Sequence, residues 1–509
     1  MTESSEPRNE PVWWDGFEPL KLPSMRTNVR ADVCVVGAGI AGLTTAYLLA
    51  AEGRSVVVVD DGPLGSGMTG ATSAHLVTAL DRRYGDIERM RGAEGAKLAA
   101  ASHAAAIDRI EEIARREKIP CDFQRVDGFL FAGRDRRKVR PEEIEEEFAA
   151  AGRAGADVGM ASGAGLPFET GPCLRFRRQA QFHPLRYLSG LARAVRRRGG
   201  RVFGGFHAER IEAGAPARVT GADRRITARA VVVATNSPVN DRVAIHTKQA
   251  PYMTYVVGAL VPEGSVPRAL YWDTEDPFHY VRLQGVGKGR ECLIVGGEDH
   301  KTGQADDIAE RHGRLEAWAQ ERFPMIESFA YRWGGQVLDT LDGLAFIGRN
   351  PGDENVFIAT GDSGVGLTHG TIAGMLLTDL ILGRENPWTE LYEPSRKLPQ
   401  AAGRFLKQNV NVAAQYADWV TPGDADSTRE ITRDSGAVVR RGASKVAVYR
   451  DAEGKLHALS AVCPHLGCLV KWNDAEKTWD CPCHGSRFDK RGKVVNGPAN
   501  TDLAPASVD

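Results

Sequence analysis

Two short segments near the C-terminus place cysteine and histidine side chains at spacings that can hold metal. Residues 463–468 read C-P-H-L-G-C, and residues 481–486 read C-P-C-H-G-S. Two thiolates and two imidazoles can hold tetrahedral zinc, or a 2Fe–2S cluster in which histidines bind one of the irons. A zinc finger would pair its cysteines on one side, whereas here each segment supplies one cysteine and one histidine. The pattern favours the cluster, and its predicted ligands are Cys463, His465, Cys481 and His484.

A glycine-rich turn near the N-terminus could cradle phosphates. Residues 33–43 read V-C-V-V-G-A-G-I-A-G-L. In a dinucleotide fingerprint the first glycine permits a tight turn, the second lets the backbone approach a pyrophosphate, and the third lets helix and strand pack closely. The helix N-terminus then offers N–H groups to the phosphates, and an acid further on binds a ribose hydroxyl. The spacing does not distinguish FAD from NAD, and its predicted binding residues are Gly37, Gly39, Gly42 and Asp60.

A βαβ unit must position this turn. Residues 31–36 and 55–59 are β-branched runs that suit parallel strands buried on both faces, and residues 40–51 between them have an apolar helical pattern. The order strand, glycine turn, helix, strand is typical of an α/β fold. Further strands are predicted at residues 228–234 and 356–359. Further helices are predicted at residues 92–118, 184–198, 308–323 and 369–382.

The pattern changes in the second half of the chain. Between residues 252 and 296, short aromatic and β-branched runs are separated by Pro and Gly turns, which indicates an antiparallel sheet. Residues 421–427 (T-P-G-D-A-D-S) form the best linker candidate, and short strands follow them. The predicted fold class is α/β plus all-β, with a Rossmann-like dinucleotide-binding domain, an inserted antiparallel-sheet substrate domain and a small all-β domain at the end.

Composition limits the partners and the location of the protein. The chain has 509 residues, of which 42% are hydrophobic and 26% charged, as in a typical globular protein. The formal net charge of −1 gives no pull toward nucleic acid or anionic membranes. We find no secretion signal and no run near the ~18 apolar residues of a membrane span. We therefore expect a cytoplasmic protein with no nucleic-acid partner and no membrane span.

Residues 30–390 resemble the glycine/D-amino-acid oxidase group of flavoproteins. Three segments carry the resemblance: the fingerprint, residues 230–238 (A-V-V-V-A-T-N-S-P), and residues 342–382, which include G-D-S-G-V-G-L-T-H-G. The resemblance implies that the dinucleotide is FAD and that Ala234 and Thr235 contact it. It also implies a Gly-rich turn over the isoalloxazine ring, which maps to Gly361, Gly364, Gly366, Leu367 and Thr368.

A loop at residues 65–76 would pass beside the flavin. It makes Thr72, Ser73 and His75 candidates for cofactor binding. In some relatives, such as dimethylglycine dehydrogenase, a histidine in a similar loop is covalently attached to the flavin. His75 lies at about that position, so the resemblance admits either a covalent link or a non-covalent contact.

The C-terminal segments resemble the Rieske domain of the cytochrome bc complexes. In that group a disulfide bridges the ligand loops, which maps to Cys468 and Cys483, and a serine that matches Ser486 donates a hydrogen bond to a bridging sulfide. A tyrosine two positions later donates to a ligand sulfur, but this chain has Phe488. Because one donor is missing, we expect an intermediate reduction potential within the Rieske range of about −150 to +300 mV.

Together the resemblances imply a division of the chain. An oxidoreductase domain is expected at residues 30–420, the linker at 421–427 and the Rieske domain at 428–509. Within the first, the expected FAD-binding parts are about 30–110, 180–245 and 335–390, and the substrate-domain parts are about 111–180 and 246–335.

By the same resemblance the substrate is a small amine or amino acid, which loses hydride from a carbon next to nitrogen. We find no convincing equivalent of the family's carboxylate-binding arginine, although Arg282 and Arg332 are candidates. The catalytic candidates in the antiparallel segment are Tyr252, Tyr255, Trp272, His279 and Tyr280.

The two cofactors differ in the number of electrons that they carry. A reduced flavin carries two, whereas one 2Fe–2S cluster accepts one. We therefore expect an FAD-dependent dehydrogenase whose Rieske cluster passes electrons singly to an external acceptor, with the edge formed by His465 and His484 as the exit. The alternatives are a reductase component for a partner oxygenase and a non-catalytic redox sensor.

Overall fold

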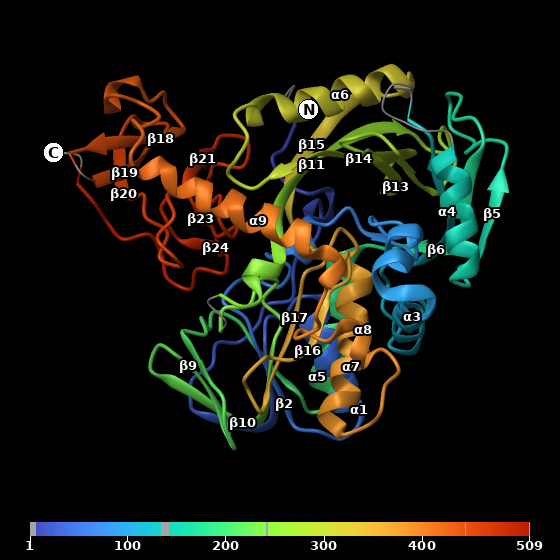
Figure 1. The fold of residues 1–509 in the computed structure, drawn as a ribbon, viewed down its shortest axis with the longest axis horizontal. Helices are drawn as coiled ribbons and strands as arrows, with labels where there is room; N and C mark the ends of the chain where they lie inside the picture. The colour runs from blue at the N-terminus through green and yellow to red at the C-terminus, as the bar shows by residue number, and fades with distance from the viewer. Residues whose placement is uncertain (1–6, 134–141, 241–242, 443, 508–509) are drawn as a thin grey trace.

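Two large sheets form the body of the protein in the computed structural model, which describes residues 7–133, 142–240, 243–442 and 444–507. One sheet lies beneath the other in Figure 1, and the C-terminal strands form a smaller domain beside them. The predicted fold class, α/β followed by a small all-β domain, is confirmed.

The first large sheet carries the glycine turn. Its main strands run in the order β16-β17-β10-β1-β2-β7, parallel except for β16, and a β8–β9 hairpin extends β10. All four residues of β2 are buried valines, as expected for a strand covered on both faces. The strands are β1 (Val29–Val36), β2 (Val56–Val59), β7 (Arg201–Phe203), β8 (Arg210–Glu212), β9 (Ala217–Gly221), β10 (Arg224–Val233), β16 (Phe346–Arg349) and β17 (Val356–Thr360).

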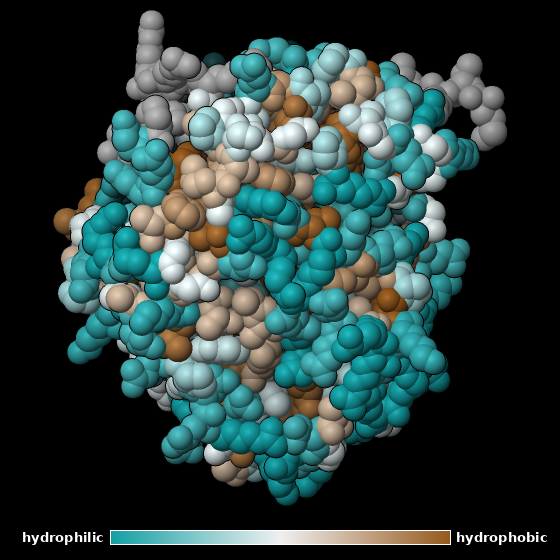
Figure 2. Space-filling view, turned by 90° about the vertical axis from the view of Figure 1, so that its right-hand side faces the viewer, coloured by the Kyte–Doolittle hydropathy of each residue, from teal (hydrophilic) through white to brown (hydrophobic). Residues whose placement is uncertain are grey.

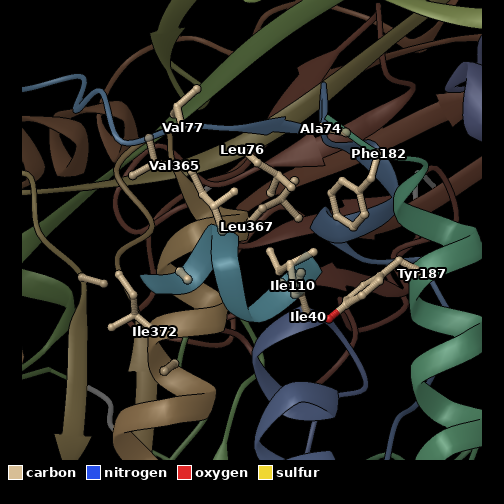
Figure 3. Packing of buried hydrophobic residues seen from close by; sticks show 14 of the residues in the cluster. Ile40, Ala74, Leu76, Val77, Ile110, Phe182, Tyr187, Val365, Leu367 and Ile372 are labelled. Atoms are coloured by element: carbon tan, nitrogen blue, oxygen red, sulfur yellow. The ribbon is translucent and has the colours of Figure 1, made fainter. Parts of the chain in front are cut away.

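Helices cover this sheet and meet in the main hydrophobic core. Figure 3 shows Ile40, Ile110 and Leu367 packed below Leu76, where separate helices and a short strand converge. Gly370 of α7 approaches α1 so closely that a Cβ there would lie 2.7 Å from Ile40 Cγ2. These helices are α1 (Ile40–Ala51), α3 (Tyr84–Arg116), α5 (Pro184–Arg197) and α7 (Gly366–Leu382).

The second large sheet runs in the order β15-β11-β14-β13-β12-β4-β6-β3, with β5 beside β6. It is antiparallel from β15 to β12, as expected, but β12 pairs with β4 in parallel. Its strands are β3 (His75–Leu76), β4 (Gln124–Phe131), β5 (Val158–Ala161), β6 (Cys173–Gln181), β11 (Gln249–Pro262), β12 (Leu270–Asp273), β13 (Tyr280–Gly287), β14 (Arg290–Lys301) and β15 (Ser328–Thr340). Helices α2 (Met68–Ala71), α4 (Glu142–Arg153), α6 (Arg311–Arg322) and α8 (Thr389–Tyr392) complete this part.

A helix that we did not expect, α9 (Ala402–Gln415), leads to the C-terminal domain (Figure 1). Residues 421–427 then run along β18, because Asp424 N donates to Val438 O at 2.7 Å and Ala425 bridges to Val439. Two small sheets follow, β18-β19-β20 and β21-β22-β23-β24. Their strands are β18 (Ser435–Arg441), β19 (Ser444–Arg450), β20 (Leu456–Ser460), β21 (Lys471–Asn473), β22 (Thr478–Asp480), β23 (Arg487–Asp489) and β24 (Val494–Asn496).

Among the described residues, none of the helices combines the length and apolar character needed to cross a bilayer. Figure 2 shows a largely hydrophilic face on which the hydrophobic residues lie in small patches.

Candidate functional site

A cavity of about 560 Å³ opens between the two large sheets. Its wall takes residues from the carboxyl ends of β1, β2 and β17 and from β11 to β15 of the second sheet, with β13 contributing Tyr280. Ligands in open α/β sheets bind beyond the carboxyl ends of the strands, and this volume is typical of a cofactor site. The cavity is therefore the candidate site for a dinucleotide and its substrate.

The three glycines of the fingerprint lie where close approach is needed. Gly37 has a φ of +104°, and a Cβ there would lie 2.3 Å from Ala234 O. A Cβ on Gly42 would lie 1.9 Å from Gly37 O, so Gly42 lets α1 pack against the turn. Gly37 and Gly39 line the cavity and Gly42 does not. The turn therefore gives a phosphate access to the backbone at the N-terminus of α1.

Asp60 lies at the end of β2 and lines the same cavity. Its Oδ2 accepts a hydrogen bond from Ala38 N at 2.6 Å, and its Oδ1 accepts one from Gly62 N at 2.9 Å. Burial raises the pKa of Asp60 to about 6. These bonds fix the carboxylate beside the glycine turn, where the ribose of a dinucleotide would lie.

The segment after β10 forms the rest of the cavity end that would hold the dinucleotide. Ala234 and Thr235 line the cavity, as does Asn236, whose buried Nδ2 has no hydrogen-bond partner. A buried donor without a partner is rare. The glycine cradle, the helix N-terminus, the acid and this amide together fit FAD.

The loop that contains Thr72, Ser73 and His75 lines the cavity, as expected. Ser73 Oγ lies 3.0 Å from His75 Nδ1, and the His75 ring meets the Tyr280 ring edge-on with centroids 5.6 Å apart. Burial, helped by the charge of Arg282, lowers the pKa of His75 to about 3. His75 therefore offers a neutral imidazole to whatever occupies the cavity.

The turn before α7 and the start of that helix reach the cavity next to Asp81. Gly364, Gly366 and Leu367 line the cavity, whereas Gly361 and Thr368 do not. A Cβ on Gly364, whose φ is +80°, would lie on the carboxylate of Asp81. Sequence reasoning missed Asp81, because only the fold brings it to a turn far along the chain.

Two of the five catalytic candidates line the cavity and three do not. Trp272 and Tyr280 line the cavity. Tyr255 does not, because it lies on the opposite face of β11 from cavity-lining Thr254, and its hydroxyl lies 3.1 Å from His300 Nε2. His279 stacks on Trp318 behind the wall, and Tyr252 also lies outside the lining.

Neither candidate for a carboxylate-binding arginine lines the cavity. Arg282 is fully buried and donates to backbone carbonyls, including Ala74 O at 2.8 Å, so it holds the His75 loop in place. Arg332 pairs with Glu316. Arg83, which sequence reasoning missed, is the only lysine or arginine in the part of the lining that the structure describes, and its buried Nη1 has no partner.

Where the second sheet forms the cavity wall, several carboxylate side chains line it, compared with the single arginine Arg83. Asp299 on β14 has a buried Oδ1 that accepts no hydrogen bond. Burial raises its pKa to about 6, and burial together with Asp299 raises the pKa of Asp81 to about 7. A nearby cation would stabilise the charged form of these acids. The carboxylates that line this end are Asp81, Asp273, Glu275, Asp276 and Asp299.

The four predicted metal ligands come together in the C-terminal domain. Cys463 and Cys481 are buried, and their closeness lowers the pKa of Cys463, which accepts a hydrogen bond from the Cys481 thiol. The rings of His465 and His484 lie 5.0 Å apart. Nδ1 of His484 is buried without a partner, and burial lowers its pKa to about 3. Neutral imidazole and thiolate are the forms that bind metal, so these residues fit a 2Fe–2S cluster.

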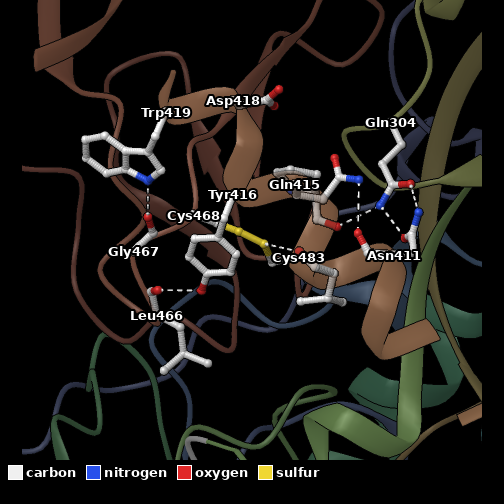
Figure 4. The surroundings of a disulfide bond; sticks show 12 residues. Gln304, Asn411, Gln415, Tyr416, Asp418, Trp419, Leu466, Gly467, Cys468 and Cys483 are labelled. Carbon is white, nitrogen blue, oxygen red and sulfur yellow. Dashed lines mark hydrogen bonds between the residues drawn. A yellow bond between two sulfur atoms is a disulfide. The ribbon is translucent and has the colours of Figure 1, made fainter. Parts of the chain in front are cut away.

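A disulfide between Cys468 and Cys483 joins the two ligand loops, as the resemblance implied (Figure 4). The first loop is also held by the residues that follow α9. Tyr416 donates to Leu466 O at 2.7 Å, and Trp419 Nε1 donates to Gly467 O at 3.1 Å. The chain that leads into the domain therefore braces the loop that carries Cys463.

Ser486 and Phe488 lie at the two positions where the Rieske resemblance implies hydrogen-bond donors to sulfur. Ser486 Oγ accepts a hydrogen bond from Ala499 N at 2.9 Å, which leaves its O–H free to donate, and it hydrogen-bonds with Cys463. Phe488 is fully buried in the same apolar cluster as the cysteines. An apolar ring thus occupies the position at which the related Rieske domains have a hydroxyl donor.

The edge formed by His465 and His484 contacts the oxidoreductase domain: His484 is buried there and His465 is partly exposed. His246 follows β10 in the chain. The centroid of its ring lies 5.1 Å from that of His465 and 6.1 Å from that of His484. On the same side, Gln336 Nε2 donates to Gly485 O at 2.6 Å, and Gln336 also lines the cavity. One glutamine therefore contacts both sites, which the sequence could not indicate because β15 is far from both motifs.

Known proteins match both halves of the chain. Residues 32–380 match the family of FAD-dependent oxidoreductases, and residues 422–506 match the Rieske [2Fe–2S] domain. The chain is 30% identical to the Rieske 2Fe–2S iron–sulfur protein YhfW of Bacillus subtilis, and the alignment covers 98% of each chain. It is 28% identical over 371 residues to γ-glutamylputrescine oxidoreductase of Escherichia coli, covering 71% of this chain and 85% of that protein.

Solved structures share the fold of the larger part. Glycine oxidase from Geobacillus kaustophilus superposes with a TM-score of 0.61 at 18% identity, covering 73% of this chain and 100% of that one. L-proline dehydrogenase from P. horikoshii superposes with a TM-score of 0.59 at 16% identity, covering 72% of this chain and 98% of that one.

Proposed function

Because the chain belongs to the family of FAD-dependent oxidoreductases and carries a Rieske domain, we propose that it is a dehydrogenase of small amines that releases electrons singly to an external acceptor. The two family matches show that the cofactors are FAD and one 2Fe–2S cluster. The prediction of a cluster instead of a zinc ion is therefore confirmed. When bound, FAD accepts a hydride from the carbon next to nitrogen, and the cluster accepts one electron at a time.

One observation carries the proposal: a single residue contacts both sites. Gln336 lines the cavity and donates to Gly485, which lies between the predicted ligand His484 and Ser486. A Cβ on Gly485 would lie 2.4 Å from Pro251 Cβ, so the loop is packed tightly against the oxidoreductase domain. The position of His246 against both histidines supports entry of electrons at this edge. We propose that the external acceptor takes its electrons at another surface of the Rieske domain.

The charge of the cavity favours an amine over an amino acid. The carboxylates at the second-sheet end would hold a cationic nitrogen and would repel a substrate carboxylate. Trp272 and Tyr280 offer apolar ring surface beside them. The overall change is R–CH₂–NH₂ → R–CH=NH + 2e⁻ + 2H⁺, and water then converts the imine to an aldehyde and ammonia. Arg83 is the only lysine or arginine among the described lining residues, so we expect an amino-acid substrate to depend on it.

An anaerobic screen tests the proposal. Mono-, di- and polyamines, amino acids and NADH are each mixed with the holoprotein, and the flavin and cluster absorbance are followed together. We expect amines to bleach the flavin first and the cluster next. Bleaching by NADH would instead support a reductase component, and bleaching by none of them would support a redox sensor.

Two variants separate the substrate classes. Asp299→Asn should raise the KM of a diamine about 10-fold, as expected for a lost charge-assisted contact, with little change in kcat. Arg83→Gln is the matched control and should leave the diamine KM unchanged. If amino acids are the only substrates, and Arg83→Gln abolishes their binding, the preference for amines is wrong.

A further inference from the structure

One stretch of the cavity wall comes from the Rieske domain. It consists of β24 and the turn that follows it, and it is the only part of residues 428–507, apart from undescribed residue 443, that reaches the cavity. The lining residues are Val494, Val495, Asn496, Gly497, Ala499 and Asn500. A domain that holds a different cofactor therefore supplies part of the FAD site.

This stretch lies at the adenosine end of the cavity. Asn500 Nδ2 donates to Ala208 O at 2.9 Å and to Glu209 O at 3.0 Å. Asn500 O lies 3.0 Å from His207 Nε2, and His207 Nδ1 lies 3.2 Å from Asp61 Oδ2. Asp61 follows Asp60, the acid placed to bind ribose, and His207 and Ala208 line the cavity. The contacts therefore fix the stretch beside the ribose position.

Asn496 presents an unused acceptor at this place. The residue is only 8% exposed, and its Oδ1 is buried without a hydrogen-bond partner. A buried carbonyl oxygen without a donor is destabilising unless a ligand supplies one. The exocyclic amine of adenine and the ribose hydroxyls are donors of the required kind.

We propose that residues 494–500 of the Rieske domain complete the FAD site by covering the adenosine half of the cofactor. FAD is then held between two domains, with its phosphates on the glycine turn and its adenosine against β24. The stretch is also tied to the second cluster loop, because Ala499 N donates to Ser486 Oγ at 2.9 Å. Binding of FAD and docking of the Rieske domain therefore favour each other.

A comparison of FAD with FMN tests this proposal directly, because FMN lacks the adenosine. Full-length apoprotein from flavin-limited cells is titrated with each flavin, and the quenching of flavin fluorescence gives the Kd. In Asn496→Leu and Asn500→Ala we expect the Kd of FAD to rise about 5- to 10-fold, which corresponds to one or two lost hydrogen bonds. The Kd of FMN should stay unchanged.

Asn411→Ala is the matched control. Asn411 lies on α9 and its side chain bonds with Gln304, which in turn donates to Pro482 O of the Rieske domain at 3.0 Å. It therefore supports a contact between the two domains, but it does not line the cavity. This variant should leave the Kd of FAD unchanged. Iron content, the EPR spectrum of the cluster and the melting temperature report whether each variant is folded.

Three outcomes would overturn the proposal: an unchanged Kd of FAD in both variants, equal weakening of FAD and FMN, or the same loss in Asn411→Ala. None of the measurements uses a substrate, so the result does not depend on the proposed amine dehydrogenase activity.

Discussion

The two cofactor sites of this protein are built in different ways. The predicted cluster ligands are four side chains in two loops that a disulfide joins. The FAD cavity is lined by many segments of the chain, from Val36 to Asn500, and its phosphate end is a glycine turn. A site made of a few ligand side chains should fail when one of them is changed. A site shared among many segments should lose most affinity where room for the backbone is lost, and less when one side chain is changed.

The largest expected effect is the loss of the cluster. Cys481→Ala removes one of the two predicted thiolate ligands, and a Rieske cluster needs both. We expect the EPR signal and the bound iron to disappear, while the purified protein still binds FAD. Cys292→Ala, at another buried cysteine, is the control and should keep the cluster. A retained Rieske signal in Cys481→Ala would show that the ligand assignment is wrong.

The corresponding change in the FAD cavity is Gly37→Ala. The new Cβ would lie 2.3 Å from Ala234 O at a φ of +104°, so the turn must move away from the phosphates. Strain costs about 1–3 kcal/mol, and a lost hydrogen bond to a charged group costs about 1.5–3 kcal/mol. We expect the affinity for FAD, measured by fluorescence titration, to fall by more than about 100-fold while the cluster stays.

Gly53→Ala separates strain from the effect on the cofactor. Gly53 also has a positive φ, +76°, but a Cβ there would meet no atom within 4 Å. It should lower stability by about 1–2 kcal/mol without weakening FAD binding. Equal loss of FAD in the two variants would contradict the proposed role of Gly37.

The same difference explains what the sequence could predict. The glycine turn and the cluster loops are local patterns, because each motif lies within about a dozen residues and its spacing follows from one turn or loop. Tyr255 lies outside the cavity lining because the face of a strand depends on register that composition does not reveal, and His279 lies outside it in the connection between β12 and β13. Arg282 binds backbone carbonyls instead of a substrate. Asp81, Gln336 and Asn496 reach the cavity only through distant packing, which no local pattern records.

Loss of the disulfide should have a smaller effect, confined to the cluster. Cys468 and Cys483 are 15 residues apart, and closing a loop of this length stabilises a fold by about 2–3 kcal/mol. In Cys468→Ala/Cys483→Ala, heating should bleach the cluster at a lower temperature, whereas the release of FAD should change less. Absorbance and flavin fluorescence followed in one thermal scan give both values. A larger shift in FAD release than in cluster loss would contradict this order.

The smallest expected effect is a shift in reduction potential from Phe488→Tyr. Phe488 is buried in the apolar cluster that contains Cys463 and Cys481. A hydroxyl that donates to a ligand sulfur stabilises the reduced cluster, which carries one more negative charge. A net hydrogen bond of about 0.5–1.5 kcal/mol corresponds to a rise of about 20–60 mV for one electron, since a tenfold change in the equilibrium constant is 59 mV.

A redox titration followed by EPR measures this shift, and the flavin potential in the same sample is the internal reference. Ser486→Ala removes a donor and should move the cluster potential in the opposite direction. An unchanged potential in Phe488→Tyr would mean that the new hydroxyl does not reach a sulfur. The flavin potential should stay constant in both variants, because the contacts that tune the cluster lie in its own two loops, whereas the contacts around FAD are shared among many segments.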